Sequence, residues 1–218
     1  MKYVHVLAEG LTEVTFVKQV LCEYFIEHGL LLDSRAVETS RTSQKIYRGG
    51  LSNYVKARED LKRWMKERPG DYFTSMLDFY RLPTDFPGMN HRAKSNLAKV
   101  KYIESEFALD IACQRFIPYI QLHEFEALLF TDITLLKVEL LKKDDAIDAL
   151  QNETKHLLPE DINNGPTTSP SKRILSKLPN YDKVANGVPV TRAIGVDALC
   201  KACPHFREWI DILKNLAK

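Results

Sequence analysis

Acidic side chains follow several apolar segments of this chain at the point where each segment ends. Glu9 follows residues 3–7, Asp78 follows residues 72–77, and an acidic stretch follows residues 115–122. These segments are rich in β-branched and aromatic residues, which predicts buried strands. If the strands are parallel neighbours, their carboxyl ends lie at one edge of the sheet. We therefore expect these residues to meet there: Glu9, Glu13, Asp78, His123, Glu124 and Glu126.

Carboxylates held close together repel one another, and some take up protons unless a cation neutralises them. Mg²⁺ and Mn²⁺ prefer oxygen ligands and keep positions open for phosphate and water. Two such ions can activate a water and stabilise the leaving oxygen of a phosphodiester. Singly, each residue has a structural explanation, such as Glu13 favouring the helix dipole or His123 and Glu126 pairing with basic residues. As a set, they predict a metal site formed by Glu9, Glu13, Asp78, Glu124 and Glu126, with Glu9 and His123 as catalytic groups.

The bulk composition is that of an ordinary globular protein, with 218 residues, 44% hydrophobic and 28% charged. The sequence has neither a membrane-length apolar run nor a signal-peptide pattern. Four cysteines in a chain of this length do not form a disulfide framework, so we expect a reducing, cytoplasmic environment. Cys200 and Cys203 have zinc-like spacing with His205 nearby, but Cys22 and Cys113 lie in apolar patterns. Core thiols are therefore the favoured interpretation.

Charge gives limited information about partners, because the formal net charge is only +2. Basic residues outnumber acidic ones between Arg41 and Arg68. That local excess suits a phosphate-rich partner. It also fits the solvated face of one helix, and we slightly favour this second interpretation.

Hydrophobic periodicity predicts an α/β fold, with a mainly parallel sheet flanked by helices and a helical C-terminal part. Thr12 and Ser171 are expected to cap helices, residues 42–52 to form a loop, and Pro118 to mark an edge position or a bulge. We expect an α/β domain over residues 1–130, with residues 131–218 packed on it as a helical extension. The predicted strands are 3–7, 34–39, 72–77 and 115–122, and the predicted helices are 13–28, 53–67, 93–108, 127–130, 133–141, 145–150, 172–178, 190–201 and 204–216.

Several motifs resemble a known family. LAEGLTE resembles the glutamate motif of TOPRIM domains, and MLDFY occupies the place of their second acidic motif. More closely, EGLTE, MLDFYRLPTDFPG, PYIQLHEFEALLF, GPTTSPSKRI and CPHFREWI resemble the bacterial TOPRIM-like family catalogued as domain of unknown function 4276. The resemblance runs from Val4 to about Leu213. It implies similarity to nuclease subunits of anti-phage or mobile-element systems, which often lie beside ATPase genes.

By this resemblance, Glu9 corresponds to the catalytic glutamate of TOPRIM domains and Asp78 to their first metal-binding aspartate. The chain departs from the family pattern at Tyr80, where TOPRIM domains have a second aspartate. Either Glu124 or Glu126 supplies the missing oxygen, or metal binding is weak and the domain is not catalytic. Phosphates of a bound nucleic acid are expected at Arg48, Ser169, Ser171, Lys172 and Arg173.

These observations leave three functions open. The first is a Mg²⁺- or Mn²⁺-dependent nuclease acting on DNA or RNA, with an ATPase partner. The second is a non-catalytic binding or sensor subunit that docks on an ATPase. The third is a phosphoryl-transfer enzyme acting on nucleotides, which is disfavoured because the sequence contains no GxxxxGK[ST] loop. The sequence does not distinguish DNA from RNA and does not reveal the oligomeric state.

Overall fold

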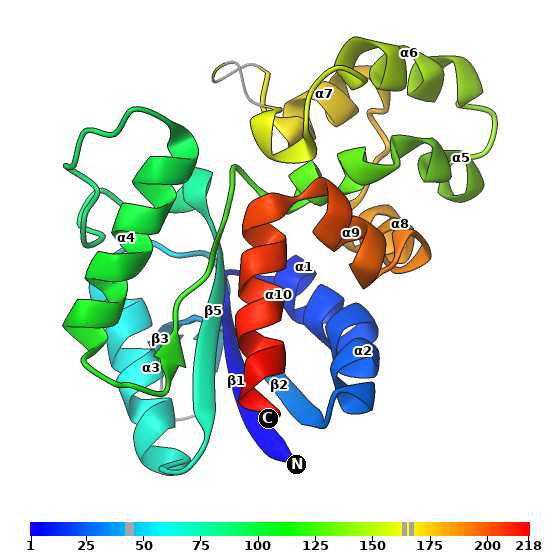
Figure 1. Ribbon diagram of the computed structural model, residues 1–218. Coiled ribbons are helices and arrows are strands. Elements are labelled where there is room, and N and C mark those ends of the chain that lie inside the picture. The colour runs from blue at the N-terminus through cyan, green and yellow to red at the C-terminus, as the bar shows by residue number, and fades with distance from the viewer. Residues whose placement is uncertain (42–45, 163–164, 166–167) are drawn as a thin grey trace.

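A parallel β-sheet lies at the centre of the computed structural model, which describes residues 1–41, 46–162, 165 and 168–218 (Figure 1). Every strand pair in this sheet is parallel, so the strands that precede Glu9 and Asp78 end on the same side. The expected α/β class is confirmed. The strand order is β2 (Leu30–Ala36), β1 (Lys2–Ala8), β5 (Tyr72–Asp78) and β6 (Phe116–Ile117), with β7 (Ile120–Gln121) also paired to β5.

Helices cover both faces of the sheet (Figure 1). One face carries α3 (Tyr54–Glu67) and α4 (Asn96–Ile111), which bury their apolar sides in a shared core with β5. The side chains of Asn53 and Ser95 cap these helices by accepting backbone N–H groups three residues on. The other face carries α1 (Leu11–Phe16), a π-helical turn (Val17–Leu21), α2 (Cys22–Glu27) and α10 (Pro204–Leu216).

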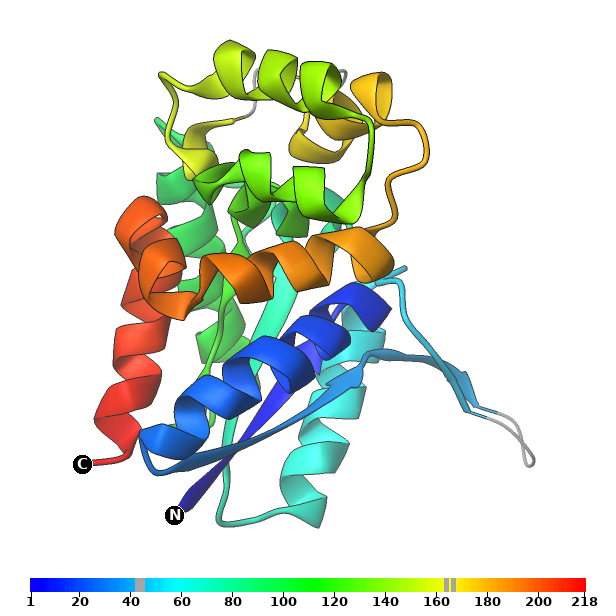
Figure 2. The same cartoon turned by 90° about the vertical axis from the view of Figure 1, so that its right-hand side faces the viewer.

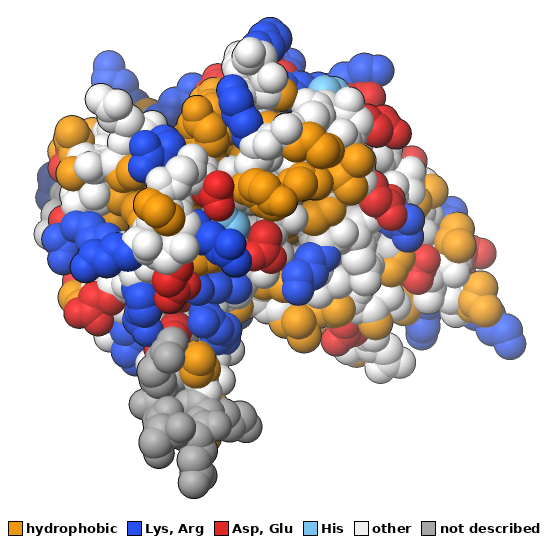
Figure 3. Space-filling model, turned by 90° about the horizontal axis from the view of Figure 1, so that it is seen from below, with side chains coloured by type: hydrophobic (Ala, Val, Ile, Leu, Met, Phe, Trp, Pro, Cys, Tyr) orange, Lys and Arg blue, Asp and Glu red, His pale blue; other side chains and the backbone are white. Residues whose placement is uncertain are grey.

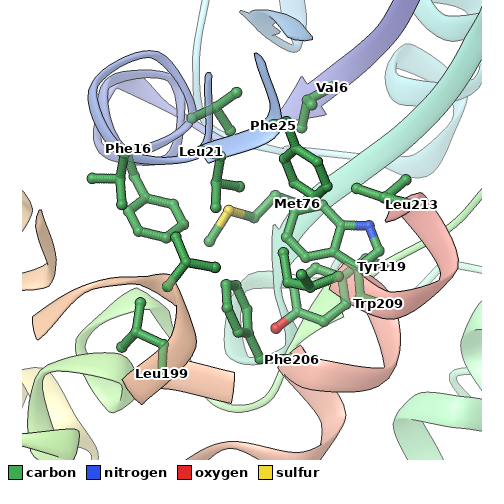
Figure 4. Packing of buried hydrophobic residues seen from close by; sticks show 14 of the residues in the cluster. Val6, Phe16, Leu21, Phe25, Met76, Tyr119, Leu199, Phe206, Trp209 and Leu213 are labelled. Atoms are coloured by element: carbon green, nitrogen blue, oxygen red, sulfur yellow. The ribbon is translucent and has the colours of Figure 1, made fainter. Parts of the chain in front are cut away.

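The C-terminal helix α10 is fixed to the middle of the sheet by aromatic side chains (Figure 4). The rings of Trp209 and Tyr119 stack with centroids 4.2 Å apart and planes 7° from parallel. Trp209 also donates its indole N–H to Thr74 Oγ1 on β5 across 2.8 Å. Burying a large apolar side chain of this kind contributes about 1.5–3 kcal/mol. The end of the chain is therefore part of the main core.

Further helices lie over the carboxyl ends of the strands, at the top of Figure 1. They enclose a core of their own that includes Leu129, Leu150 and Ile174. The division of the chain after residue 130 remains a prediction. The elements are η3 (Phe125–Thr131), η4 (Ile133–Leu135), α5 (Leu136–Glu139), α6 (Asp144–Thr154), η5 (Pro159–Asp161), α7 (Pro170–Lys177), η6 (Lys183–Gly187), α8 (Val188–Ile194) and α9 (Val196–Ala202).

The chain between β2 and α3 differs from expectation. β2 begins at Leu30, earlier than predicted, and the chain then enters β3 (Glu38–Arg41). β3 pairs antiparallel with β4 (Ile46–Arg48), so part of the expected loop 42–52 is a strand, although positions 42–45 lie outside the described residues. This hairpin extends away from the main body (Figure 2).

The two expected helix caps are wrong. α1 begins at Leu11 after Gly10, whose N–H donates to the Glu13 carboxylate across 2.8 Å, so Thr12 is already inside the helix. α7 begins at Pro170 after Ser169, because proline suits the first turn of a helix. Ser171 is therefore also inside its helix.

Other boundaries follow proline and glycine. The expected strand 115–122 is divided at Pro118 into β6 and β7, and β6 lies at the edge of the sheet, as its proline predicted. The expected helix 190–201 is two helices, because Gly195 has a φ of 81°, a value that strains other residues. Within the described residues, every helix is too short or too polar to span a lipid bilayer.

Candidate metal centre at the carboxyl edge of the sheet

Glu9 and Asp78 meet where β1 and β5 end. The strands are paired in register, Ala8 opposite Met76. Glu9 continues this pairing by donating its N–H to the Met76 carbonyl across 3.1 Å. The N–H of Asp78 then donates to Glu9 Oε2 across 3.2 Å. The structure thus places two acids from distant parts of the chain at one point of the sheet edge.

The Asp78 carboxylate ties this point to the segment that follows β7. Its Oδ1 accepts the N–H of Phe125 across 3.0 Å. Asp78 is only 2% exposed. Burial, reinforced by the negative charges of Glu13 and Glu9, raises its pKa well above the usual range. A third strand end therefore adjoins the first two.

Glu13, in the first turn of α1, interacts electrostatically with Glu9, which precedes the helix. Glu13 is buried, and its side chain accepts the N–H of Gly10. Burial raises the pKa of Glu13. Burial and the charge of Glu13 raise the pKa of Glu9 to about 7, although the Asp78 N–H and the charges of Arg81 and Lys183 oppose the shift. Glu9 is therefore poised to exchange a proton near neutral pH.

Glu126 is a further buried acid at this site, and it forms an ion pair with Lys183. Its side chain is fully buried, and Lys183 Nζ lies 2.9 Å from each of its carboxylate oxygens. Burial raises the pKa of Glu126 to about 7 despite this ion pair. Burial lowers the pKa of Lys183, but the charge of Glu126, its hydrogen bond and the charge of Asp78 outweigh burial and raise it. Lys183 is therefore charged inside the acid cluster.

Lys183 and Arg81 are the functional candidates that the sequence reasoning missed. Lys183 lies 57 positions after Glu126, in a segment with no recognisable motif. It begins η6, whose N-cap Asp182 accepts the N–H groups of Val184 and Ala185. Arg81 directly follows the acidic motif, and that adjacency was the available signal.

Glu124 and His123 face different surroundings. Both carboxylate oxygens of Glu124 accept from Ser171, one from its N–H at 2.7 Å and one from its hydroxyl at 3.0 Å. The side chain of Glu124 thus occupies the anion position at the start of α7. His123 Nε2 lies 2.8 Å from the Glu160 carbonyl oxygen, so this nitrogen carries the hydrogen. Burial lowers the pKa of His123, which favours a neutral ring directed toward Glu160.

The expected phosphate-binding residues divide into two groups. The guanidinium of Arg48 lies 3.2 Å from Asp60 Oδ2 and donates to the Ala36 carbonyl. Arg173 is buried, pairs with Glu153 and donates to the Thr168 carbonyl. Both guanidinium groups therefore serve internal contacts. In contrast, Ser169, Ser171 and Lys172 line a pocket of about 360 Å³ together with Tyr80, Arg81 and Glu124.

Arg81 also lines a second pocket, of about 500 Å³, beside Glu9. The wall of this second pocket includes Gly49 and Gly50, whose φ values are 102° and 77°. Gly50 donates its N–H to the Glu9 carbonyl across 3.0 Å. The glycine loop therefore approaches the acid cluster closely, and Arg81 stands between the two pockets.

The chemistry of the cluster suits a hard cation. Four buried acids, Glu9, Glu13, Asp78 and Glu126, interact electrostatically with the single ammonium of Lys183. Oxygen-only ligands of this kind are those that Mg²⁺ and Mn²⁺ prefer. As the side chains stand in the described part of the chain, no three Asp, Glu, His or Cys residues form a ready-made metal-ligand group. The fit therefore rests on the donor types and on the raised pKa values of the acids, which a bound cation would lower.

The C-x-x-C pair lies elsewhere, and its residues have other contacts. Cys203 is buried in the main core, with its sulfur 3.8 Å from Thr131 Oγ1. His205 Nε2 lies 3.0 Å from Glu104 Oε1, and its ring stacks on Tyr119 with centroids 5.2 Å apart. These residues belong to the core, as the sequence interpretation favoured.

Comparison with known proteins yields one family and one structure. The family model described as "Domain of unknown function (DUF4276)" matches residues 8–214. The chain is also similar to the solved C-terminal region of the Xanthomonas campestris pv. campestris OLD protein. That likeness has 14% sequence identity, covers 97% of each chain and has a TM-score of 0.41. Among proteins with curated descriptions, none matches significantly.

Proposed function

The chain belongs to the DUF4276 family, and we propose that it is a metal-dependent nuclease that hydrolyses phosphodiester bonds of DNA or RNA at a TOPRIM-like site. The observation that carries this proposal is the contact between Glu9 and Asp78, with Glu13 and Glu126 adjoining. Buried acids with raised pKa values are a common sign of a functional site. Here they come from three strand ends, at the edge where open α/β sheets bind ligands.

In this proposal Glu9, Glu13, Asp78 and Glu126 hold one or two Mg²⁺ or Mn²⁺ ions. Such ions, when bound, polarise the phosphate and lower the pKa of a water. Glu9 accepts the proton of the attacking water at its carboxylate. The Lys183 ammonium offers positive charge to the phosphate oxygens as negative charge develops on them.

The remaining residues position the substrate or the site. Arg81, between the two pockets, is placed to bind a phosphate. Glu124 fixes the start of α7 through Ser171. His123, for which the sequence predicted proton transfer, takes a positioning role in this proposal, because its carbonyl accepts the N–H of Tyr80 across 3.1 Å.

A cleavage assay tests the proposal. The purified protein is incubated with supercoiled plasmid, circular single-stranded DNA or tRNA, in Mg²⁺, Mn²⁺ or EDTA. We expect cleavage of at least one substrate with the metal, none in EDTA, and losses of about 100-fold or more for Glu9→Gln and Asp78→Asn. The exposed Glu59→Gln on α3 is the matched control and retains activity. Undiminished cleavage in EDTA, or by Glu9→Gln, would contradict the assigned roles.

A second candidate is a non-catalytic subunit that binds nucleic acid or docks on an ATPase. The ion pair between Lys183 and Glu126 favours it, since the cluster already contains a cation of its own. Tyr80, at the place of the second TOPRIM acid, favours it too. If the subunit binds nucleic acid without cutting it, a gel-shift assay finds binding but no cleavage with either metal, and Glu9→Gln binds the nucleic acid as tightly as wild type. The ATPase partner and the role in anti-phage or mobile-element systems stay predictions.

A further inference from the structure

Tyr80 presents an aromatic ring on the wall of the pocket beside the acid cluster. The residue is 40% exposed and lines the pocket of about 360 Å³. Its ring packs nearly parallel to that of Phe79, with centroids 6.4 Å apart and planes 13° from parallel. On another side lies the His123 ring, at 5.6 Å. The backbone N–H of Tyr80 also donates to the backbone carbonyl of His123. These contacts hold the Tyr80 ring in place although much of it faces solvent.

The groups around this ring are those that a nucleotide requires. Arg81 and Lys172 line the same pocket and offer positive charge to a phosphate. The Glu124 carboxylate, also on this wall, is fixed by its two hydrogen bonds from Ser171. Isolated exposed aromatic side chains are common on protein surfaces. An aromatic ring beside cations, in a pocket next to buried acids, is instead typical of a platform on which an unstacked base rests.

Several arginines of the described chain are held by acids and are not presented to a duplex. Binding a duplex through its backbone uses many phosphate contacts. In the first third of the chain, Arg35 and Arg48 pair with Asp60, and Arg63 pairs with Glu38. Figure 3 views the end of the molecule that carries the chain termini, away from the pocket, and there acidic and basic side chains are interspersed. The pocket itself offers two cations and an aromatic ring, so a ligand that gains affinity from stacking suits it better than a duplex does.

From this geometry we propose that the site takes single-stranded nucleic acid, with one unstacked base lying on the ring of Tyr80 and the adjoining phosphate between Arg81 and Lys172. This inference rests on the proposed nuclease function and names its substrate class. It also gives Tyr80 a role of its own in place of the missing TOPRIM acid. The ring sits two positions after Asp78, so the stacked base adjoins the bond to be cut.

Fluorescence anisotropy in EDTA tests the inference without cleavage. The probes are labelled oligothymidylate, labelled oligouridylate and a labelled DNA duplex. We expect both single strands, or one of them, to bind more tightly than the duplex. Tyr80→Ala should weaken single-strand binding by about 5- to 100-fold, while Tyr80→Trp should remain within about twofold of wild type because it preserves a stacking ring. Tyr3→Ala is the matched control, because Tyr3 is 50% exposed at the opposite end of β1.

An abasic scan supplies the sharper readout. A single abasic nucleotide is moved along the single-stranded probe, and one position should lower the affinity of the wild-type protein. In Tyr80→Ala that position should lose its effect, which is the coupling expected of two groups in contact. Tighter binding of the duplex, or an abasic effect that persists in Tyr80→Ala, would overturn the inference. If metal-dependent cleavage is absent while this coupling is found, the nuclease proposal fails and the strand-binding role of Tyr80 stands.

Discussion

The backbone N–H of Asp78 donates to the carboxylate of Glu9 across 3.2 Å, although 69 positions separate the two residues. The contact follows from the parallel pairing of β1 and β5, which end at the same edge. This one hydrogen bond does not offset the cost of burying two ionised carboxylates, since the pKa of both is raised. A bound cation would offset that cost, which is the physical basis of the proposed metal site.

Stability should depend on pH through Glu9 and Glu126. Their pKa values rise from 4.5 to about 7 on folding. Between these values the folded protein retains protons that the unfolded chain has lost. The free energy of unfolding of the metal-free protein therefore falls as pH rises through this window, by on the order of 3 kcal/mol for each group.

Urea denaturation on either side of that window measures the effect. Glu9→Gln should show a flatter dependence than wild type, whereas Glu59→Gln should match wild type. Saturating Mg²⁺ should restore stability at the alkaline end, because a ligand that binds only the folded state stabilises it. If the free energy of unfolding depends on pH with the same slope in wild type and in Glu9→Gln, then folding does not raise the pKa of Glu9.

Lys183→Met should destabilise the metal-free protein above neutral pH. The substitution leaves the fully buried Glu126 without its cation. The expected loss is about 3 kcal/mol or less, because Lys183 is partly exposed. Glu126→Gln in the same chain should recover much of the loss. Chemical denaturation of the two single variants and the double variant gives the coupling energy, and a value near zero would rule out a significant ion pair.

Glu160 should anchor the start of α10. Its carboxylate oxygens accept the N–H groups of His205 and Phe206, each across 3.0 Å. Glu160→Ala leaves these buried donors unpaired and should cost about 1–3 kcal/mol. The control is Glu208→Ala in the same helix, whose exposed ion pair with Lys101 is worth less than about 1 kcal/mol. Thermal unfolding should place the Glu160 variant well below the control, and similar Tm values would refute the capping role.

Gly187 should be intolerant of a side chain. A Cβ at this position would lie 2.5 Å from the Tyr181 hydroxyl and 3.2 Å from the Phe125 ring. Gly187→Ala should therefore destabilise the protein by about 1–3 kcal/mol. It should also lower metal affinity, since Gly187 ends the segment that Lys183 begins.

A double variant tests the cause. The buried Tyr181 hydroxyl has no hydrogen-bond partner among the described residues, so Tyr181→Phe alone should be neutral or mildly stabilising. Combined with Gly187→Ala, it should relieve part of the loss. Equal losses with and without the hydroxyl would mean that the crowding has another source.

Much of the sheet edge was predictable because the signals are local. β1 and β5 are apolar runs with an acid at the end, and parallel pairing brings such ends together. Pro118 likewise marked the edge of the sheet. The division of the helix at Gly195 and the hairpin after β2 depend on tertiary contacts and backbone geometry that periodicity does not encode.

The electrostatic partners were not predictable from local sequence. Lys183 reaches Glu126 only through the path of the helices that follow β7. Ser171 was expected to contact phosphate at the start of a helix, yet its N–H and hydroxyl both donate to Glu124. The basic excess around Arg48 fitted a solvated helix face slightly better than a phosphate-rich partner, and Arg48, which was expected to contact phosphate, is held by Asp60. Such pairings depend on which acids lie nearby in three dimensions.

Calorimetric titration with Mn²⁺ tests the central claim most directly. Near the pKa of Glu9, about 7, we predict saturable binding to the wild-type protein with release of protons, at least about tenfold weaker in Asp78→Asn and unchanged in Glu59→Gln. If wild type takes up no Mn²⁺ at millimolar concentration, or Asp78→Asn binds it as tightly, the acid cluster is not a metal site.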